Sequence, residues 1–186
     1  TTTELNLADF FRLNGISYEA LPIETNDEGK ENLFAGRCDV YTTDASGLSS
    51  TRAAASNPDK WVVLPEIISK EPLGPLVRHG DHQWGDVVRW SLNAMIIAEE
   101  LGITSENVDA QMSSNVPEVL RLLGVEGNYG EMLELSNDWA YQIIKQIGNY
   151  SESYEANVGP DTPLEIARGL NALWTQGGIL YAPPFR

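Results

Sequence analysis

The most constraining feature of the chain is the run of residues 36–48, in which strand-forming residues lead directly into a helix start. Val40 and Tyr41 favour an extended strand, whereas Asp44 and Ser46 are typical of a helix cap. In open α/β sheets, ligands bind at the carboxyl ends of the strands. The run therefore predicts an α/β unit that carries polar residues at the usual ligand position.

Two interpretations of these polar residues are open. The hydroxyl groups of Thr42 and Thr43, with the carboxylate of Asp44, could hold the amino group of a small ligand. Alternatively, Thr43 or Asp44 only caps the helix that follows. The spacing alone does not decide between the two.

A second polar cluster, Thr1, Thr2 and Thr3, precedes an amphipathic helix, with Glu4 at capping-box spacing from Thr1. The first backbone N–H groups of a helix have no intrahelical partner, so with the threonine hydroxyls they could bind a carboxylate. One cluster would then accept an ammonium group and the other would donate to a carboxylate. Together the two clusters suit the zwitterionic head of an α-amino acid.

Charge and composition exclude several other classes of partner. The chain has 186 residues and a formal net charge of −15, which argues against nucleic acid and anionic lipid, because phosphate binding needs clustered Lys and Arg. No apolar run is long enough to span a bilayer, and the single cysteine, Cys38, has no partner for a disulfide within the chain. We expect one or two domains without direct membrane insertion.

The first part of the chain alternates helical and extended patterns, which predicts a small α/β lobe with mainly parallel strands. The predicted elements are helices at 3–13, 26–35 and 46–56 and strands at 17–23, 38–43 and 60–64. The stretch 65–78 is rich in proline and suits a crossover between lobes.

Every later element is predicted to be a helix. The longest is 82–101, whose apolar stripe is wide enough to need more than one partner surface. The stripe includes Trp84, Val87, Val88, Leu92, Met95 and Ile96. The other predicted helices are 105–112, 116–123, 138–147, 150–157 and 163–174.

Signatures of an enzyme are weak. His79, Asp81 and His82 are the most metal-like group, but no second cluster with zinc-ligand spacing supports them. The nucleophile elbow, the P-loop and the zinc-protease helix motif are all missing. We therefore expect no enzyme, no metal and no cofactor.

Four separated segments carry a resemblance: TTTELNLADFFR, AGRCDVYTTDASGL, VVLPEIISKEPLGPLVRHGD and IARGLNALWTQGGILYAPPFR. In these segments the chain resembles the general L-amino-acid substrate-binding proteins of bacterial ABC importers. The resemblance implies a periplasmic type II binding protein that delivers L-amino acids to a membrane permease. It also implies a small α/β lobe with crossover at 1–77, and at 78–186 the helical carboxyl-terminal part of a large lobe whose amino-terminal part is missing.

The resemblance assigns roles to the two polar clusters. Asp44 matches the family carboxylate that contacts the ligand ammonium, and Thr1, Thr2 and Thr3 match the segment that meets the ligand carboxylate. Thr42 and Thr43 are second-rank candidates beside Asp44. The family's arginine for the carboxylate lies in the missing portion, so the chain is expected to be a truncated form with half of the ligand site.

Three functions follow for consideration. The first is amino-acid binding for ABC import. The second is an assembly module without ligand that dimerises through its carboxyl-terminal helices, since a helix face without its usual partner favours a homo-oligomer. The third, a small hydrolase on the same scaffold, is the least supported.

Overall fold

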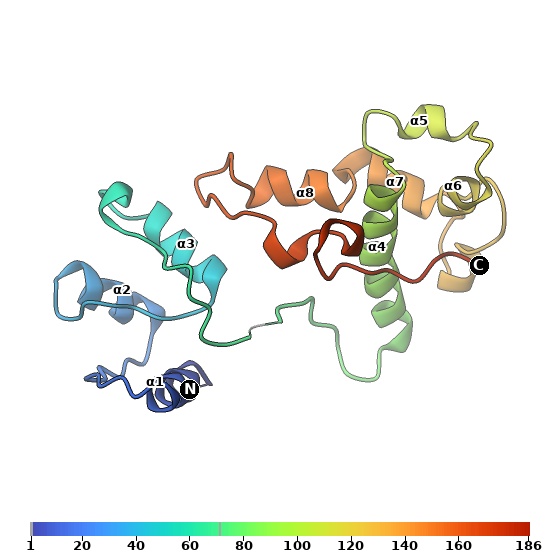
Figure 1. The fold of residues 1–186 in the computed structure, drawn as a ribbon. Coiled ribbons are helices and arrows are strands. Elements are labelled where there is room, and N and C mark those ends of the chain that lie inside the picture. Colours follow the sequence, from blue (N-terminus) through green and yellow to red (C-terminus); the bar gives the residue numbers. More distant parts are fainter. Residues whose placement is uncertain (1, 71) are drawn as a thin grey trace. The chain divides into compact units, whose positions relative to one another are not determined.

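The computed structural model describes residues 2–70 and 72–186, and its internal contacts divide the chain into two units, Thr1–Leu73 and Gly74–Arg186 (Figure 1). The first unit, unit 1, contains helices α1 (Thr2–Leu13), α2 (Asn26–Phe34) and α3 (Ala45–Ala53) and a 3-10 turn, η1 (Pro58–Lys60). The three predicted helices of this unit are confirmed, each to within a few residues at its ends.

Side chains that precede α2 and α3 fix where these helices begin. The Oγ1 atom of Thr25 accepts a hydrogen bond from the Glu28 N–H, and the Asp44 carboxylate accepts one from the Gly47 N–H. Each cap satisfies a backbone donor that the first helical turn leaves without a partner. The helix starts are therefore local consequences of the sequence.

The predicted parallel sheet of unit 1 is not confirmed. Segments 17–23, 38–43 and 60–64 contain no strand among the described residues. Strand propensity describes a side chain that fits a half-buried pleated surface, and it makes a strand only where a neighbouring segment completes the hydrogen-bond ladder. Val40 and Val62 instead stand 68% and 77% exposed. The observed unit is helical, with extended segments that have no ladder.

The second unit, unit 2, is helical and larger. Its helices are α4 (His82–Glu100), α5 (Val108–Gln111), α6 (Pro117–Leu122), α7 (Trp139–Ile147) and α8 (Tyr150–Asn157). Its 3-10 turns are η2 (Glu131–Leu133), η3 (Gly169–Asn171) and η4 (Trp174–Gln176). The prediction that helices dominate this part of the chain is confirmed.

The core of unit 2 forms around α4, which packs against α7, α8 and η2. Ala94, Ile97 and Ala98 are buried on α4, as Ile144 is on α7. Phe185, near the end of the chain, packs its ring against three other aromatic rings of the unit, those of Trp90, Tyr129 and Trp139. The wide apolar stripe predicted on α4 is only partly covered within the unit: Ile96 is buried in this core, whereas Trp84 and Leu92 remain 55% and 38% exposed.

One predicted helix of unit 2 is wrong and another is shorter than predicted. Residues 163–174 form only the turns η3 and η4, because tertiary contacts hold this stretch: the Ile166 N–H donates to the Val158 carbonyl, and the Tyr154 hydroxyl donates to the Ala167 carbonyl. The predicted helix 105–112 begins only at Val108. Before it, the N–H and hydroxyl groups of Ser105 donate to the Glu152 carboxylate.

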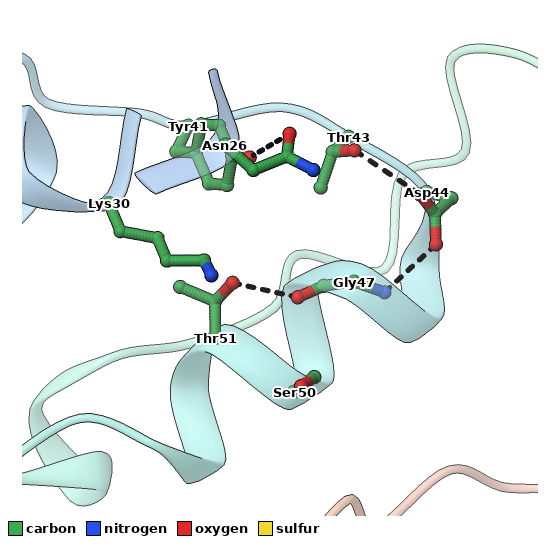
Figure 2. Close-up of a pocket in the computed structure, with 8 residues that line it drawn as sticks. All are labelled: Asn26, Lys30, Tyr41, Thr43, Asp44, Gly47, Ser50 and Thr51. Atoms are coloured by element: carbon green, nitrogen blue, oxygen red, sulfur yellow. Dashed lines mark hydrogen bonds between the residues drawn. The ribbon is translucent and has the colours of Figure 1, made fainter. Parts of the chain in front are cut away.

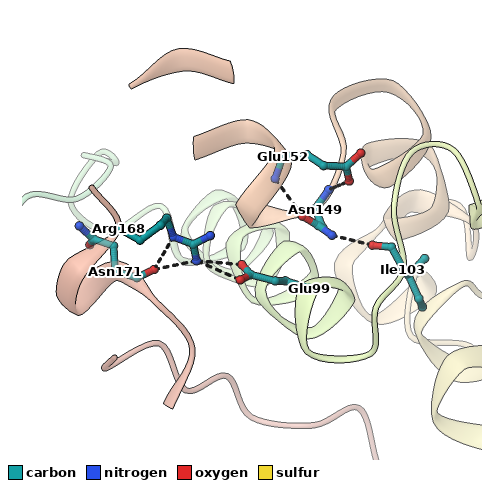
Figure 3. Close-up of polar contacts among 6 residues, drawn as sticks. All are labelled: Glu99, Ile103, Asn149, Glu152, Arg168 and Asn171. Carbon is teal, nitrogen blue, oxygen red and sulfur yellow. Dashed lines mark hydrogen bonds and ion pairs between the residues drawn. The ribbon is translucent and has the colours of Figure 1, made fainter. Parts of the chain in front are cut away.

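Two groups of polar contacts link the carboxyl end of α4 and the residue Ile103 after it to later parts of the chain (Figure 3). The Arg168 guanidinium lies 3.0 Å from both carboxylate oxygens of Glu99, and it also donates to the Asn171 carbonyl. Asn149 caps α8 in a reciprocal capping box with Glu152, and its side-chain amide donates to the Ile103 carbonyl. The contacts form two separate sets, one around Arg168 and one around Asn149, and each joins residues far apart in the sequence.

Candidate ligand-binding site

A pocket of about 110 Å³ lies within unit 1 between α2, the segment before α3, and α3 itself (Figure 2). Polar groups dominate its lining, and both a carboxylate and an ammonium group are among them. The lining residues are Asn26, Lys30, Tyr41, Thr43, Asp44, Gly47, Ser50 and Thr51. Such a pocket has the size for the polar head of a small molecule or a few waters.

The Asp44 carboxylate is held in place by its own helix cap. Its Oδ2 atom accepts hydrogen bonds from the Ser46 hydroxyl at 2.7 Å and from the Gly47 N–H at 2.9 Å. Its Oδ1 atom accepts a longer bond, 3.3 Å, from the Thr43 hydroxyl. Bonds from Ser46 and then Gly47 lower the pKa of Asp44, so the group is a carboxylate at neutral pH. Asp44 therefore does cap α3, which leaves its ligand role a prediction, and Oδ1 is the oxygen with capacity for another donor.

The first turns of α3 supply the next wall of the pocket. The Thr51 hydroxyl donates to the Gly47 carbonyl at 2.8 Å and is largely buried. A Cβ atom at Gly47 would lie only 3.2 Å from both the Asp44 Oδ2 atom and the Thr43 methyl group. Glycine therefore lets the first turn of α3 lie close to the carboxylate that caps it.

Helix α2 and Tyr41 form the opposite wall. The Tyr41 hydroxyl donates to the Asn26 Oδ1 atom at 3.1 Å, and burial raises the pKa of Tyr41. The Tyr41 ring packs so closely on α2 that a Cβ atom at Gly29 would lie 2.6 Å from it. Lys30 extends from α2 toward the side of the pocket that carries Thr51 (Figure 2).

The structure brings together only some of the residues that the sequence predicts for the site. Thr43 and Asp44 line the pocket. Thr42 precedes them without lining it, and Thr2 and Thr3, in the first turn of α1, do not line it either. Thr1 lies outside the described residues. The ligand roles given to all six remain predictions.

Sequence reasoning missed Asn26, Lys30, Tyr41, Ser50 and Thr51 as members of this pocket. A signal existed in the helical spacing, because Asn26 and Lys30 are four residues apart on α2, as Gly47 and Thr51 are on α3. Residues at this spacing share one face of a helix. Nothing in the sequence, however, shows that the two faces meet.

One member of the metal-like group of unit 2, Asp81, caps a helix in the structure. The Asp81 carboxylate accepts a hydrogen bond from the Trp84 N–H at 3.1 Å and caps α4. Across residues 2–70 and 72–186, no three His, Cys, Asp or Glu side chains gather as metal ligands would. In the same part of the chain, no helix is both long enough and apolar enough to cross a bilayer.

Curated relatives of the chain are amino-acid-binding proteins. The glutamate/glutamine/aspartate/asparagine-binding protein BztA of Rhodobacter capsulatus is 56% identical, and the putative amino-acid ABC transporter-binding protein YhdW of Escherichia coli K12 is 54% identical. The general L-amino acid-binding periplasmic protein AapJ of Rhizobium johnstonii is 56% identical. Each match covers the whole of this chain and 55% of the relative. No family model matches the chain.

A solved structure is similar along the whole chain as well. It is an ABC transporter periplasmic binding protein from Brucella ovis with glutathione bound, 52% identical, with a TM-score of 0.94 over all of this chain and 59% of that one. The protein is therefore a homologue of the periplasmic substrate-binding proteins of amino-acid ABC transporters. It spans about half the length of the curated relatives that it matches.

Proposed function

We propose that the chain takes part in binding L-amino acids in the periplasm for delivery to the membrane permease of an ABC importer. The observation that carries this proposal is the Asp44 carboxylate, which is ionised and fixed by its cap at the edge of a polar pocket. A carboxylate that needs no rearrangement before it binds an ammonium group is suited to recognise the charged end of an amino acid.

The ligands named for the similar proteins share the zwitterionic head of an α-amino acid. Glutamate, glutamine, aspartate and asparagine, named for BztA, all carry an α-ammonium and an α-carboxylate, and so does the glutamyl end of the glutathione bound to the Brucella protein. An ammonium at the Oδ1 atom of Asp44 is the contact that all of them could make. Thr2 and Thr3, in the first turn of α1, remain candidates for the carboxylate.

The affinity of the chain alone should be low. In a two-lobed binding protein both lobes close on the ligand, and the relatives are nearly twice as long as the part that matches this chain. We expect a dissociation constant in the millimolar range, which corresponds to a binding free energy of about −4 kcal/mol. An NMR titration in which the chemical shifts of the backbone amides are monitored can measure binding of that strength.

The test is Asp44→Asn, titrated with L-glutamate and L-glutamine. The substitution removes the charge but leaves an oxygen for the Gly47 N–H, so α3 keeps its cap. Loss of a charge partner should cost roughly 2 to 4 kcal/mol, which makes binding undetectable. Asp39→Asn is the matched control, because Asp39 is an exposed carboxylate of the same unit that does not line the pocket. Equal affinity in Asp44→Asn and the wild-type chain would remove Asp44 from the site.

The second candidate function is an assembly module that dimerises through the carboxyl-terminal part. One observation favours it: the segment around η3 and η4 exposes Leu170, Trp174, Ile179 and Tyr181 to between 50% and 72%. Contiguous exposed apolar side chains often mark contact surfaces. Sedimentation that shows a dimer with no amino-acid binding would favour this function over the first, and a monomer at high concentration would exclude it.

A further inference from the structure

We propose that Lys30 binds a carboxylate group of the same ligand whose ammonium group Asp44 holds. The inference rests on the proposed function and deepens it: the pocket of unit 1 would contact both charged ends of an amino acid. The carboxylate would then be bound by α2 as well as, or in place of, the first turn of α1.

The position of Lys30 is the first argument. It lies in the second turn of α2 and lines the pocket, and its side chain is only 39% exposed. Lysine side chains normally extend into solvent. Figure 2 shows the ammonium group of Lys30 directed toward Thr51 on α3, so the stem of the side chain follows the pocket wall.

The present partner of Lys30 holds it only weakly. Its Nζ atom lies 3.1 Å from the Asp27 Oδ1 atom, but the Asp27 side chain is 87% exposed and does not line the pocket. Exposed ion pairs three residues apart on a helix contribute well under 1 kcal/mol. A ligand carboxylate inside the pocket, where less water competes, can therefore replace Asp27.

The two charges lie on different walls of one pocket. Lys30 belongs to α2 and Asp44 caps α3, and both line the pocket together with Tyr41. The Tyr41 hydroxyl donates to Asn26 in the same lining, and burial raises the pKa of Tyr41. An amino acid placed between these walls would meet a negative group at its ammonium end and a positive group at a carboxylate.

The remaining lining groups fit the same ligand. The hydroxyls of Thr43, Ser50 and Thr51 and the amide of Asn26 are neutral donors or acceptors. They add no net charge that would favour a cation or an anion as such. A small zwitterion is therefore a better match to this lining than an inorganic ion.

Two carboxylates of the ligand could reach Lys30, the α-carboxylate or one at the end of an acidic side chain. The test is Lys30→Gln, titrated with L-glutamate and, separately, with L-glutamine. Loss of a charged hydrogen bond should weaken binding about tenfold to a hundredfold. Weaker binding of both ligands assigns Lys30 to the α-carboxylate, and weaker binding of glutamate alone assigns it to the side-chain carboxylate.

Three further variants make the result specific. Lys60→Gln removes the same charge from the 3-10 turn η1 of the same unit, away from the pocket, and should leave both affinities unchanged. Lys30→Arg keeps the charge and should retain most of the binding, which separates loss of charge from loss of folding. Asp27→Asn releases Lys30 from its exposed partner and should not weaken the binding of either ligand.

The outcomes separate this inference from the proposed function. If Asp44→Asn abolishes binding of both ligands while Lys30→Gln binds them as the wild-type chain does, Lys30 has no role and the proposed function stands. If Lys30→Gln and Lys60→Gln lose affinity equally, the effect is one of net charge and the inference is wrong. If the wild-type chain binds neither ligand, the proposed function fails and the inference fails with it.

Discussion

The two units of the chain are organised in different ways. All buried apolar side chains of the described residues belong to unit 2, from Ala94 to Phe185, whereas the buried residues of unit 1 are Gly29, Asn32, Ser49 and Thr51. Unit 2 therefore has a hydrophobic core, and unit 1 is organised by helix caps, short polar contacts and a few aromatic pairs such as Phe34 with Trp61.

The difference implies that unit 2 provides most of the stability, whereas unit 1 carries the candidate ligand pocket. Burial of apolar surface is the main favourable term in folding, so unit 2 should have the higher stability. Polar residues kept near the surface of unit 1 are free to meet a ligand, and the candidate pocket lies there. The unit with the candidate pocket is therefore also the unit expected to open locally at a lower free energy.

The largest effect is expected where unit 2 buries a charge pair. Arg168→Ala leaves the Glu99 carboxylate, whose side chain is 9% exposed, without its guanidinium partner and removes the contacts of Arg168 with the rings of Tyr150 and Tyr154. Breaking one side of a buried pair should lower the free energy of unfolding by about 3 to 5 kcal/mol. Urea denaturation monitored by tryptophan fluorescence measures the change.

The control for this variant is Arg89→Ala. Arg89 forms an exposed pair with Asp86 three residues earlier on α4, and its loss should cost less than about 1 kcal/mol. Equal effects of the two variants would show that the Glu99 to Arg168 contact does not hold the carboxyl-terminal segment.

A core truncation sharpens the comparison between the units. Ile144 on α7 is fully buried, so Ile144→Ala should destabilise unit 2 by about 2 to 5 kcal/mol. Ile147→Ala, one turn later and largely exposed, and Leu21→Ala in unit 1, half exposed, should each stay within about 0.5 kcal/mol. If Leu21→Ala costs as much as Ile144→Ala, unit 1 has a core of its own and the contrast between the units is wrong.

The smallest effect concerns the cap of α3 and its dependence on pH. Because hydrogen bonds from Ser46 and Gly47 lower the pKa of Asp44 below its ordinary value of 3.8, the ionised cap stabilises unit 1 above that pH. This contribution is lost as the pH falls from 3.8 through the pKa of the folded state. Hydrogen exchange of the α3 amides should show the loss in the wild-type chain, and Asp44→Asn should lack this component. If hydrogen exchange of α3 changed in the same way at low pH in the wild-type chain and in Asp44→Asn, the Asp44 cap would not be the source of the pH dependence.

Much of the helical structure could be predicted from the sequence. Helix starts depend on side chains within three residues, as at Asp44 and Asn149, and the predicted helix at 150–157 has the observed limits of α8. The place of Asp44 in the lining of the candidate pocket was also predictable, since a carboxylate between a strand-like run and a helix is a local pattern. Lys30 was not, because its place in the pocket depends on how α2 meets α3.

The sequence by itself determined where most of the helices begin, where the charged residues lie and to which proteins the chain is related, because these follow from local hydrogen bonding, from composition and from identity along the chain. Only the tertiary structure decided three other points. Segments 17–23, 38–43 and 60–64 have no ladder, and residues 163–174 are held in turns by Tyr154 and Arg168. The side of α4 that is buried is the one with Ala94, Ile97 and Ala98, where α7 and α8 pack. Each depends on contacts between residues far apart in sequence, and neither propensity nor periodicity reports such contacts.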